Sequence, residues 1–223
     1  MTYQLLLFDL DGTLTDPKEG ITKSVAYALK HFGIEADPNE LTAFIGPPLK
    51  DSFMQYYHFD EAQAMEAISK YRERFSEIGI FENRVLPGIY EMLQAVVASG
   101  KTLALATSKP EIFARRILEK YELDMYFTYI VGSEIDETRT KKSEVIEEVL
   151  KQAQISREGL KHCLMIGDRK HDVEGAKACQ LDSLGVEFGY AEKGELQRAG
   201  ADYIVNTVKE LQDFLVSHIK FDF

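Results

Sequence analysis

The sequence has only two cysteines in 223 residues and no apolar run long enough to cross a membrane. Two thiols, Cys163 and Cys179, do not predict a disulfide framework in a chain of this length. The N-terminus also lacks a basic segment ahead of its short apolar run, so it does not read as a secretory signal. These absences favour a cytoplasmic protein without a membrane partner.

The sequence also has fewer basic residues than acidic ones. Lys and Arg number 26 against 37 Asp and Glu, which gives a formal charge of −11. Such a surface repels phosphate backbones and argues against a nucleic acid polymer as a partner. A phosphate ligand would need a local cluster of cations and amides to overcome this field. The apolar fraction of 45% and the charged fraction of 28% are those of an ordinary globular protein.

Apolar segments of strand length alternate with amphipathic helical patterns along most of the chain. The near-continuous apolar character of the segments predicts a parallel sheet covered on both faces. Right-handed crossovers then predict an α/β fold with a doubly wound, Rossmann-like sheet. The expected strands are 4–8, 102–107, 129–132, 162–167, 183–188 and 202–206, with helical patterns at 88–100, 110–123, 142–153 and 172–180.

One region breaks this alternation. Residues 16–84 contain no convincing strand, and the segments 19–33, 49–59 and 61–79 all have helical patterns. We therefore expect residues 16–84 to form an all-helical domain inserted after the first strand. Residues 1–15 and 85–223 would form the α/β core, with the two chain crossings acting as hinges.

The first expected strand ends in two carboxylates, because "LLLFDLDGT" (5–13) places Asp9 and Asp11 one residue apart. A hairpin at the Asp-Gly pair is disfavoured, since a loop and a helix start follow instead of a second strand. A calcium loop is excluded because Leu7 and Lys18 would occupy its first and last ligand positions. A simple turn, in which Asp9 bonds to its own backbone, remains open from this stretch alone.

Other strand ends carry polar groups too. Thr107 and Ser108 follow the second strand, Asp168 and Asp172 follow the fourth, and the lysine pair 141–142 opens a helix after the third. Each feature alone is explained by a helix cap or a solvated side chain. Open α/β sheets, however, bind ligands outside the carboxyl ends of their strands, where all of these groups would meet.

Together these groups suggest a metal and a phosphate at one edge of the sheet. Asp9 and Asp168, with a backbone carbonyl, offer the hard oxygen ligands that suit Mg²⁺. Lys142, Thr107 and free amides offer donors for phosphate oxygens.

Four motifs now resemble those of the haloacid-dehalogenase superfamily, in its phosphatase branch. They are "DLDGT" (9–13), "TSK" (107–109), Lys142 and "GDRKHD" (167–172). The resemblance covers essentially the whole chain, including the helical insert. It implies a Rossmann-like core, an inserted helical cap, Mg²⁺ as cofactor and an aspartyl-phosphate intermediate.

The resemblance also implies roles for individual residues. Asp9 would attack phosphorus, and Asp11 would protonate the leaving alcohol and later take a proton from water. Leu10 between them would point toward the core, because side chains alternate along an extended segment. The implied phosphate-binding residues are Leu10, Asp11, Gly12, Thr107, Ser108 and Lys142, and the implied catalytic residues are Asp9, Asp11, Thr107 and Lys142. The implied metal site comprises Asp9, Asp11 through its carbonyl, Asp168, and Asp172 directly or through water.

Two positions stay open. The third motif has adjacent lysines and no following proline, so Lys141 is an alternative to Lys142. Lys109 fits the second motif, but the sequence leaves its role undecided.

The insert contains "FIGPPLKDSF" (44–53), which resembles the cap loop of phosphoglycolate-phosphatase-like proteins and related 5′-nucleotidases. A plain connection between two helices explains the same pattern. If the loop faces the site, it would supply substrate contacts and close over them. The candidate loop residues are Gly46, Pro47, Pro48, Leu49 and Lys50.

These observations predict a Mg²⁺-dependent phosphatase that acts on a small phosphate monoester. A nucleoside 5′-monophosphate is expected slightly ahead of 2-phosphoglycolate, and the protein is expected to be a monomer or a weak homodimer. The second acid, Asp11, argues against the dehalogenase branch, where no alcohol needs a proton. A sugar phosphomutase and a non-catalytic phosphate-binding regulatory protein remain as alternatives.

Overall fold

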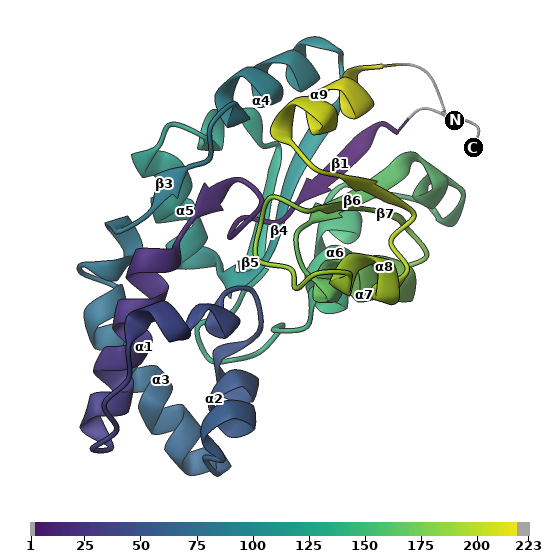
Figure 1. The fold of residues 1–223 in the computed structure, drawn as a ribbon. Helices are drawn as coiled ribbons and strands as arrows, with labels where there is room; N and C mark the ends of the chain where they lie inside the picture. Colours follow the sequence, from purple (N-terminus) through teal and green to yellow (C-terminus); the bar gives the residue numbers. More distant parts are fainter. Residues whose placement is uncertain (1–2, 218–223) are drawn as a thin grey trace.

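The computed structural model describes residues 3–217 and is built around a central sheet (Figure 1). Its six strands are all parallel and lie in the order β5-β4-β1-β6-β7-β8. This confirms the doubly wound α/β fold and each of the six expected strands. The strands are β1 (Leu5–Phe8), β4 (Thr102–Pro110), β5 (Tyr129–Ser133), β6 (Cys163–Gly167), β7 (Asp182–Val186) and β8 (Tyr203–Val205).

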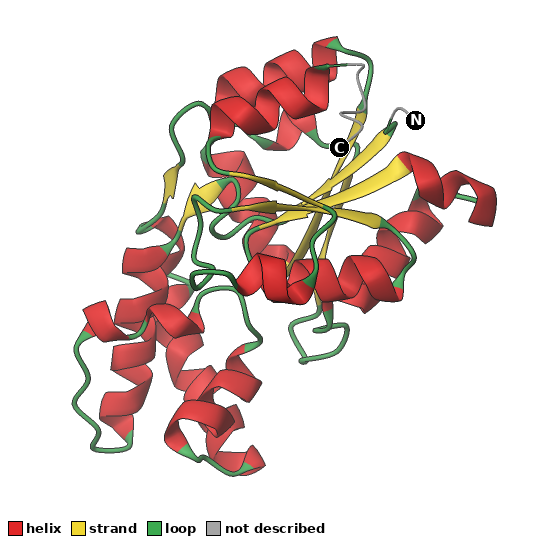
Figure 2. Ribbon diagram, turned by 45° about the vertical axis from the view of Figure 1, so that its right-hand side comes forward, coloured by secondary structure: helices red, strands yellow, loops and turns green. Residues whose placement is uncertain are grey.

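Helices cover both faces of this sheet, as Figure 2 shows. Along the fully buried strand β1, Leu6 and Phe8 pack with α4, α5 and α9, whereas Leu5 and Leu7 pack with α6 and α7. Burial on both faces is why β1 is a continuous apolar run. The helices of the core are α4 (Ile89–Ala98), α5 (Glu111–Lys120), α6 (Lys142–Gln152), α7 (Lys170–Ala178), α8 (Glu195–Ala199) and α9 (Val208–Val216).

The segment after β1 is helical, as the sequence predicts. In Figure 1 its helices form a group beside the sheet, with a buried aromatic cluster around Phe44, Phe53 and Phe59. The domain boundaries given above remain a prediction. The helices of this insert are α1 (Lys18–His31), α2 (Leu49–Tyr57) and α3 (Glu61–Phe75), and the short 3₁₀ helices of the chain are η1 (Pro38–Glu40), η2 (Thr42–Phe44), η3 (Gly79–Phe81), η4 (Asp124–Tyr126) and η5 (Arg157–His162).

The expectation that 16–84 holds no strand is wrong at its two ends. A short antiparallel pair, β2 (Thr15–Asp16) and β3 (Arg84–Val85), joins the two chain crossings. The Arg84 side chain also pairs with Asp16 at 2.6 Å. A two-residue strand is too short to show an alternating pattern, so it could not be predicted from the residues alone.

The helices α8 and α9 were also not predicted. The α8 helix has only five residues, and α9 begins at the Thr207 cap, whose hydroxyl accepts a hydrogen bond from the Glu210 amide at 3.1 Å. Both cysteines are buried and free, in agreement with the sequence. Among residues 3–217, no helix has the length and apolar character needed to span a membrane.

Candidate active site

The candidate site lies where the carboxyl ends of three neighbouring strands meet. Because β1 pairs with β4 on one side and β6 on the other, the residues that end these strands lie side by side. Asp9 follows β1, Thr107 lies near the end of β4, and Asp168 follows β6. The predicted meeting of these groups at one edge is therefore observed.

Lys142 is the cation at the centre of this edge. Its Nζ lies 2.7 Å from Asp9 Oδ1 and 2.8 Å from Asp172 Oδ1, and it donates to the Ala106 carbonyl at 2.9 Å. Burial opposes its charge, but Asp172 and Asp9 outweigh burial and raise the pKa of Lys142. Lys141 is exposed, so the choice that the sequence left open falls geometrically on Lys142.

Three buried carboxylates lie close together here, and two of them contact Lys142. Ligand atoms of Asp9, Asp168 and Asp172 all lie within 4.8 Å of one another. Burial, together with the charges of Asp172 and Asp9, raises the pKa of Asp168 well above its usual range. Burial also raises the pKa of Asp172 to about 6, although Lys142 acts in the opposite direction. One lysine does not neutralise three acids, so this cluster has the charge to hold a cation.

The position of Asp168 supports the same conclusion. Its Oδ2 accepts a hydrogen bond from the Tyr190 amide at 2.6 Å, whereas its fully buried Oδ1 has no hydrogen-bond partner. Buried carboxylate oxygens are rarely left unpaired. A free oxygen beside two further carboxylates fits the all-oxygen ligand set that Mg²⁺ prefers.

Glycines allow the backbone to close around these carboxylates. Gly12 has φ +85°, and a Cβ there would lie 2.1 Å from Asp168 Oδ2. A Cβ on Gly189 would lie 2.3 Å from the same atom, and one on Gly167 would lie 2.1 Å from Asp172 Cγ. A glycine at position 12 therefore allows the backbone to lie directly against Asp168.

Asp11 has a different partner from Asp9. Its Oδ2 lies 2.6 Å from Lys109 Nζ, and its buried Oδ1 has no hydrogen-bond partner. Burial raises the pKa of Asp11, while Lys109 opposes the rise. Leu10, between the two acids, is fully buried in the core as its alternation predicts. Lys109, whose role the sequence left undecided, thus contacts Asp11 directly.

Thr107 and Ser108 complete the strand end opposite the acids. Thr107 is buried, and its Oγ1 accepts from the Lys109 amide at 3.3 Å. Ser108 is half-buried, and both residues line the same cavity as Asp9 and Asp11. Their side chains therefore lie at the cavity that also contains the two acids.

Residues of the insert form part of the cavity wall. The loop residues Gly46, Pro47, Pro48 and Leu49 line it, so the loop faces the site, and its contact with a substrate stays a prediction. Lys50 is not among the lining residues, because its Nζ pairs with Glu61 at 2.5 Å on the surface.

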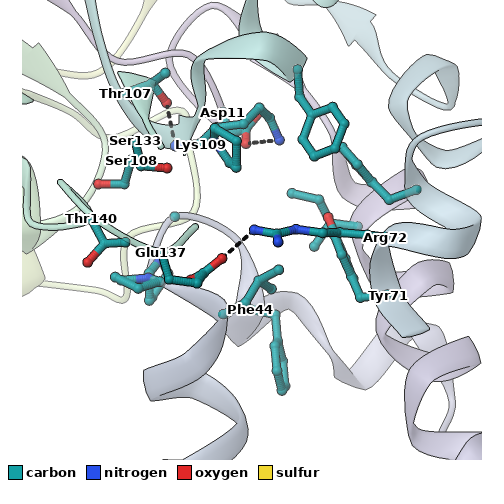
Figure 3. Close-up of a pocket in the computed structure, with 18 of the residues that line it drawn as sticks. Asp11, Phe44, Tyr71, Arg72, Thr107, Ser108, Lys109, Ser133, Glu137 and Thr140 are labelled. Carbon is teal, nitrogen blue, oxygen red and sulfur yellow. Dashed lines mark hydrogen bonds and ion pairs between the residues drawn. The ribbon is translucent and has the colours of Figure 1, made fainter. Parts of the chain in front are cut away.

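Two arginines make contacts between the insert and the core. Sequence reasoning had singled out neither of them. Arg72 of α3 pairs with Glu137 in the loop after β5 (Figure 3). Its Nη1 also donates to the Ile135 carbonyl at 2.9 Å. From the core, Arg169 donates to the Ile45 carbonyl of the insert. Arg169 itself is fixed by Glu195 at 3.0 Å.

Sequence reasoning also missed Tyr71, which lines the cavity beside Arg72. Both residues lie in a helical pattern that predicts one buried and one solvated side chain. Nothing in that pattern shows which residues of the core they face. Their contacts join positions about sixty residues apart, and no local motif encodes such a distance.

Comparisons with known proteins agree with this geometry. A family model described as haloacid dehalogenase-like hydrolase matches residues 6–186. A 5′-nucleotidase of Pseudomonas aeruginosa is 48% identical over 98% of this chain and 98% of its own. The tyrosine-protein kinase PtkA of Mycobacterium tuberculosis is 36% identical over 95% of this chain and 72% of its own.

A phosphoglycolate phosphatase of Colwellia psychrerythraea is 28% identical over 93% of this chain and 95% of its own. Among solved structures, that of a predicted phosphatase from Clostridium acetobutylicum matches with a TM-score of 0.93 and 46% identity. It covers 97% of this chain and 99% of that one. The chain therefore belongs to the family of haloacid dehalogenase-like hydrolases.

Proposed function

We propose that this phosphatase hydrolyses small phosphate monoesters, with Mg²⁺, through an aspartyl phosphate formed on Asp9. The proposal rests on one observation, which is that Asp9 and Asp11 have different partners. Asp9 lies 2.7 Å from the Lys142 ammonium, whereas Asp11 lies 2.6 Å from the Lys109 ammonium and has a raised pKa. Two neighbouring carboxylates held in different environments suit a nucleophile and a general acid.

In the first step, an Asp9 oxygen bonds to phosphorus as the bond to the leaving oxygen breaks, and Asp11 gives its proton to that oxygen. In the second step, water attacks phosphorus, its proton passes to Asp11, and the Asp9 carboxylate is released. Lys142 stabilises the charge on Asp9 and the phosphoryl group throughout. Thr107 and Ser108 orient the phosphate oxygens.

The metal site would use Asp9, Asp168 and the Asp11 carbonyl, with Asp172 in support. The unpaired Asp168 oxygen and the excess of negative charge are the features that fit a divalent cation. When bound there, Mg²⁺ would neutralise part of the phosphoryl charge. The chain's own contribution is to hold these carboxylates fixed against Gly12, Gly167 and Gly189.

We further propose that residues 16–84 act as a cap that opens for substrate. The cavity has a volume of about 70 Å³, well below the roughly 300–1,000 Å³ of typical small-molecule sites. A nucleotide therefore requires the insert to move, and the contacts of Arg72 and Arg169 are those that must break or shift. The closed state excludes water from the site.

For the substrate, a nucleoside 5′-monophosphate stays slightly ahead of 2-phosphoglycolate. The cavity wall carries Phe44, Tyr71, Phe75 and Phe113, apolar surfaces that a base or ribose could use and phosphoglycolate could not. The similarity to the Pseudomonas aeruginosa 5′-nucleotidase supports the same order. The cytoplasmic location and the monomeric or weakly dimeric state also remain predictions.

The test compares kcat/KM for UMP, AMP, 2-phosphoglycolate, pyrophosphate and glucose 1-phosphate, with the Asp9→Asn variant as control. We expect turnover of a monoester by the natural protein and none by the variant. A preference of tenfold or more for phosphoglycolate, about 1.4 kcal/mol, would reverse the order of substrates. Isomerisation of glucose 1-phosphate would favour the mutase alternative, and no turnover at all would favour the regulatory one.

A further inference from the structure

Tyr71 brings to the active-site cavity a hydroxyl that has no hydrogen-bond partner among residues 3–217. Tyr71 belongs to α3 of the insert, is only 4% exposed and lines the active-site cavity. The side chain as a whole is enclosed, and its hydroxyl makes no hydrogen bond to the described residues. A tyrosine hydroxyl that lines a cavity and is not engaged by the protein can donate a hydrogen bond to a ligand there.

The Tyr71 ring is held rigidly next to the general acid. It stacks on Phe75 with ring centroids 5.0 Å apart and an interplanar angle of 18°. The Lys109 Nζ lies 4.8 Å from the centre of the Phe75 ring and 2.6 Å from Asp11 Oδ2. Tyr71 and Lys109, the ion-pair partner of Asp11, therefore both pack against the Phe75 ring.

The Tyr71 side chain also points toward the cavity from the side that would face the leaving group. In Figure 3, Tyr71 and Arg72 approach the cavity from the side opposite Thr107 and Ser108. A phosphate held by Thr107 and Ser108 would thus present its leaving group toward Tyr71. Burial, and to a lesser extent the charge of Asp11, raises the pKa of Tyr71 well above its usual range, so the hydroxyl keeps its proton and can donate.

We propose that the Tyr71 hydroxyl determines specificity by donating a hydrogen bond to an oxygen of the leaving group, on the carbon next to the ester carbon. This proposal rests on the phosphatase function proposed above and names the substrate class more closely. A ribose 5′-phosphate carries its ring oxygen at that position, and phosphoglycolate carries its carboxylate oxygens there. A plain alkyl phosphate has no acceptor at that position and leaves the hydroxyl unpaired.

The neighbouring Arg72 does not serve the same purpose in the closed state. Its guanidinium is held by Glu137 and the Ile135 carbonyl. Tyr71, in contrast, lines the cavity with a hydroxyl that no described residue engages.

The test uses two matched esters, 2-methoxyethyl phosphate and butyl phosphate. They have nearly the same shape, but only the first has an acceptor oxygen on the second carbon. The measured quantity is the ratio of kcat/KM for the two esters, in the natural protein and in Tyr71→Phe. The phenylalanine keeps the ring that stacks on Phe75 and removes only the donor.

We expect Tyr71→Phe to lower this ratio by about three- to tenfold, the range for one hydrogen bond. The difference in leaving-group acidity affects both proteins alike and cancels. The matched control is Tyr27→Phe, because Tyr27 lies in the same insert, is 45% exposed and has its hydroxyl 3.2 Å from Glu73. It should leave the ratio unchanged, and both variants should keep the melting temperature of the natural protein within a few degrees.

The outcomes separate the two proposals. If the natural protein hydrolyses both esters and Tyr71→Phe leaves the ratio unchanged, the role of Tyr71 is refuted while the phosphatase function stands. An equal loss on both esters also refutes it, because Tyr71 would then act on the phosphoryl group or on Asp11. If the natural protein hydrolyses no phosphate ester at all, the proposed function itself fails.

Discussion

Lys142→Met should strongly destabilise the metal-free protein at neutral pH. Lys142 is 6% exposed and is shared by the buried acids Asp9 and Asp172. Removing one partner of a buried ion pair costs about 3–5 kcal/mol, because the remaining charge has neither water nor a counter-ion. For a chain of this size, that loss lowers the melting temperature by roughly 6–20 °C.

The stability lost in Lys142→Met should become smaller as the pH falls. In the natural protein the pKa of Asp172 is raised to about 6, mainly by burial, and Lys142 acts to lower it. Without Lys142 this pKa rises further. A carboxyl whose pKa is higher in the folded state binds its proton more tightly there, so folding is favoured below that pKa and opposed above it. The raised pKa of Lys142 keeps its own contribution present at both pH 5.5 and pH 7.5.

The assay is thermal unfolding followed by circular dichroism at pH 5.5 and pH 7.5, in the presence of chelator. Lys141→Met is the matched control, since Lys141 is the exposed neighbour and its replacement should cost about 0.5 kcal/mol or less. If Lys142→Met and Lys141→Met melt at the same temperature, or if the gap between them widens at pH 5.5, the described role of Lys142 is refuted.

Three further predictions concern the acids and the metal. Asp11→Asn should slow the first step more for esters of weakly acidic alcohols than for p-nitrophenyl phosphate, as rapid-quench kinetics would measure; equal losses would contradict its role as general acid. Chelator should remove activity, Mg²⁺ should restore it and excess Ca²⁺ should inhibit, because Ca²⁺ accepts more oxygen ligands; full activity in chelator would exclude the metal site. Gly12→Ala should destabilise the fold by about 1–3 kcal/mol in denaturant unfolding, because its Cβ would lie 2.1 Å from Asp168 Oδ2 at φ +85°; unchanged stability would contradict this packing.

The sheet and its acidic edge were predictable from the sequence for a physical reason. A parallel strand buried on both faces must be apolar along its whole length, and β1 and β6 are. The carboxyl ends of neighbouring parallel strands share one edge, so Asp9 and Asp168 had to be close. The order of the strands was not predicted, because the crossover rule gives the hand of each connection and not the position of each strand in the sheet.

The choice between Lys141 and Lys142 could not be made in the same way. One residue along a helix is a rotation of about 100°, which decides between the core and solvent. Both residues lie at the very start of α6, where the helical pattern has not yet fixed its phase. Only the packing of α6 against the sheet places Lys142 inside.

The contacts between insert and core were beyond sequence reasoning as well. Arg72 meets Glu137, and Arg169 meets the Ile45 carbonyl, across separations that no motif spans. The role of the Tyr71 hydroxyl could not be predicted for a different reason. A buried tyrosine on a helix usually packs a core, and only the three-dimensional cavity shows that its polar end is unpaired.

The most direct test of the central claim is to trap the phosphorylated enzyme. The protein is mixed with substrate and Mg²⁺, quenched in acid within one turnover and reduced with borohydride, which converts an acyl phosphate of aspartate into homoserine. Peptide mass spectrometry then locates the reduced residue. The account predicts substrate-dependent reduction at position 9, absent in Asp9→Asn. Reduction at position 11, or phosphate release with no reduced residue under conditions that trap a known aspartyl phosphate, would contradict it.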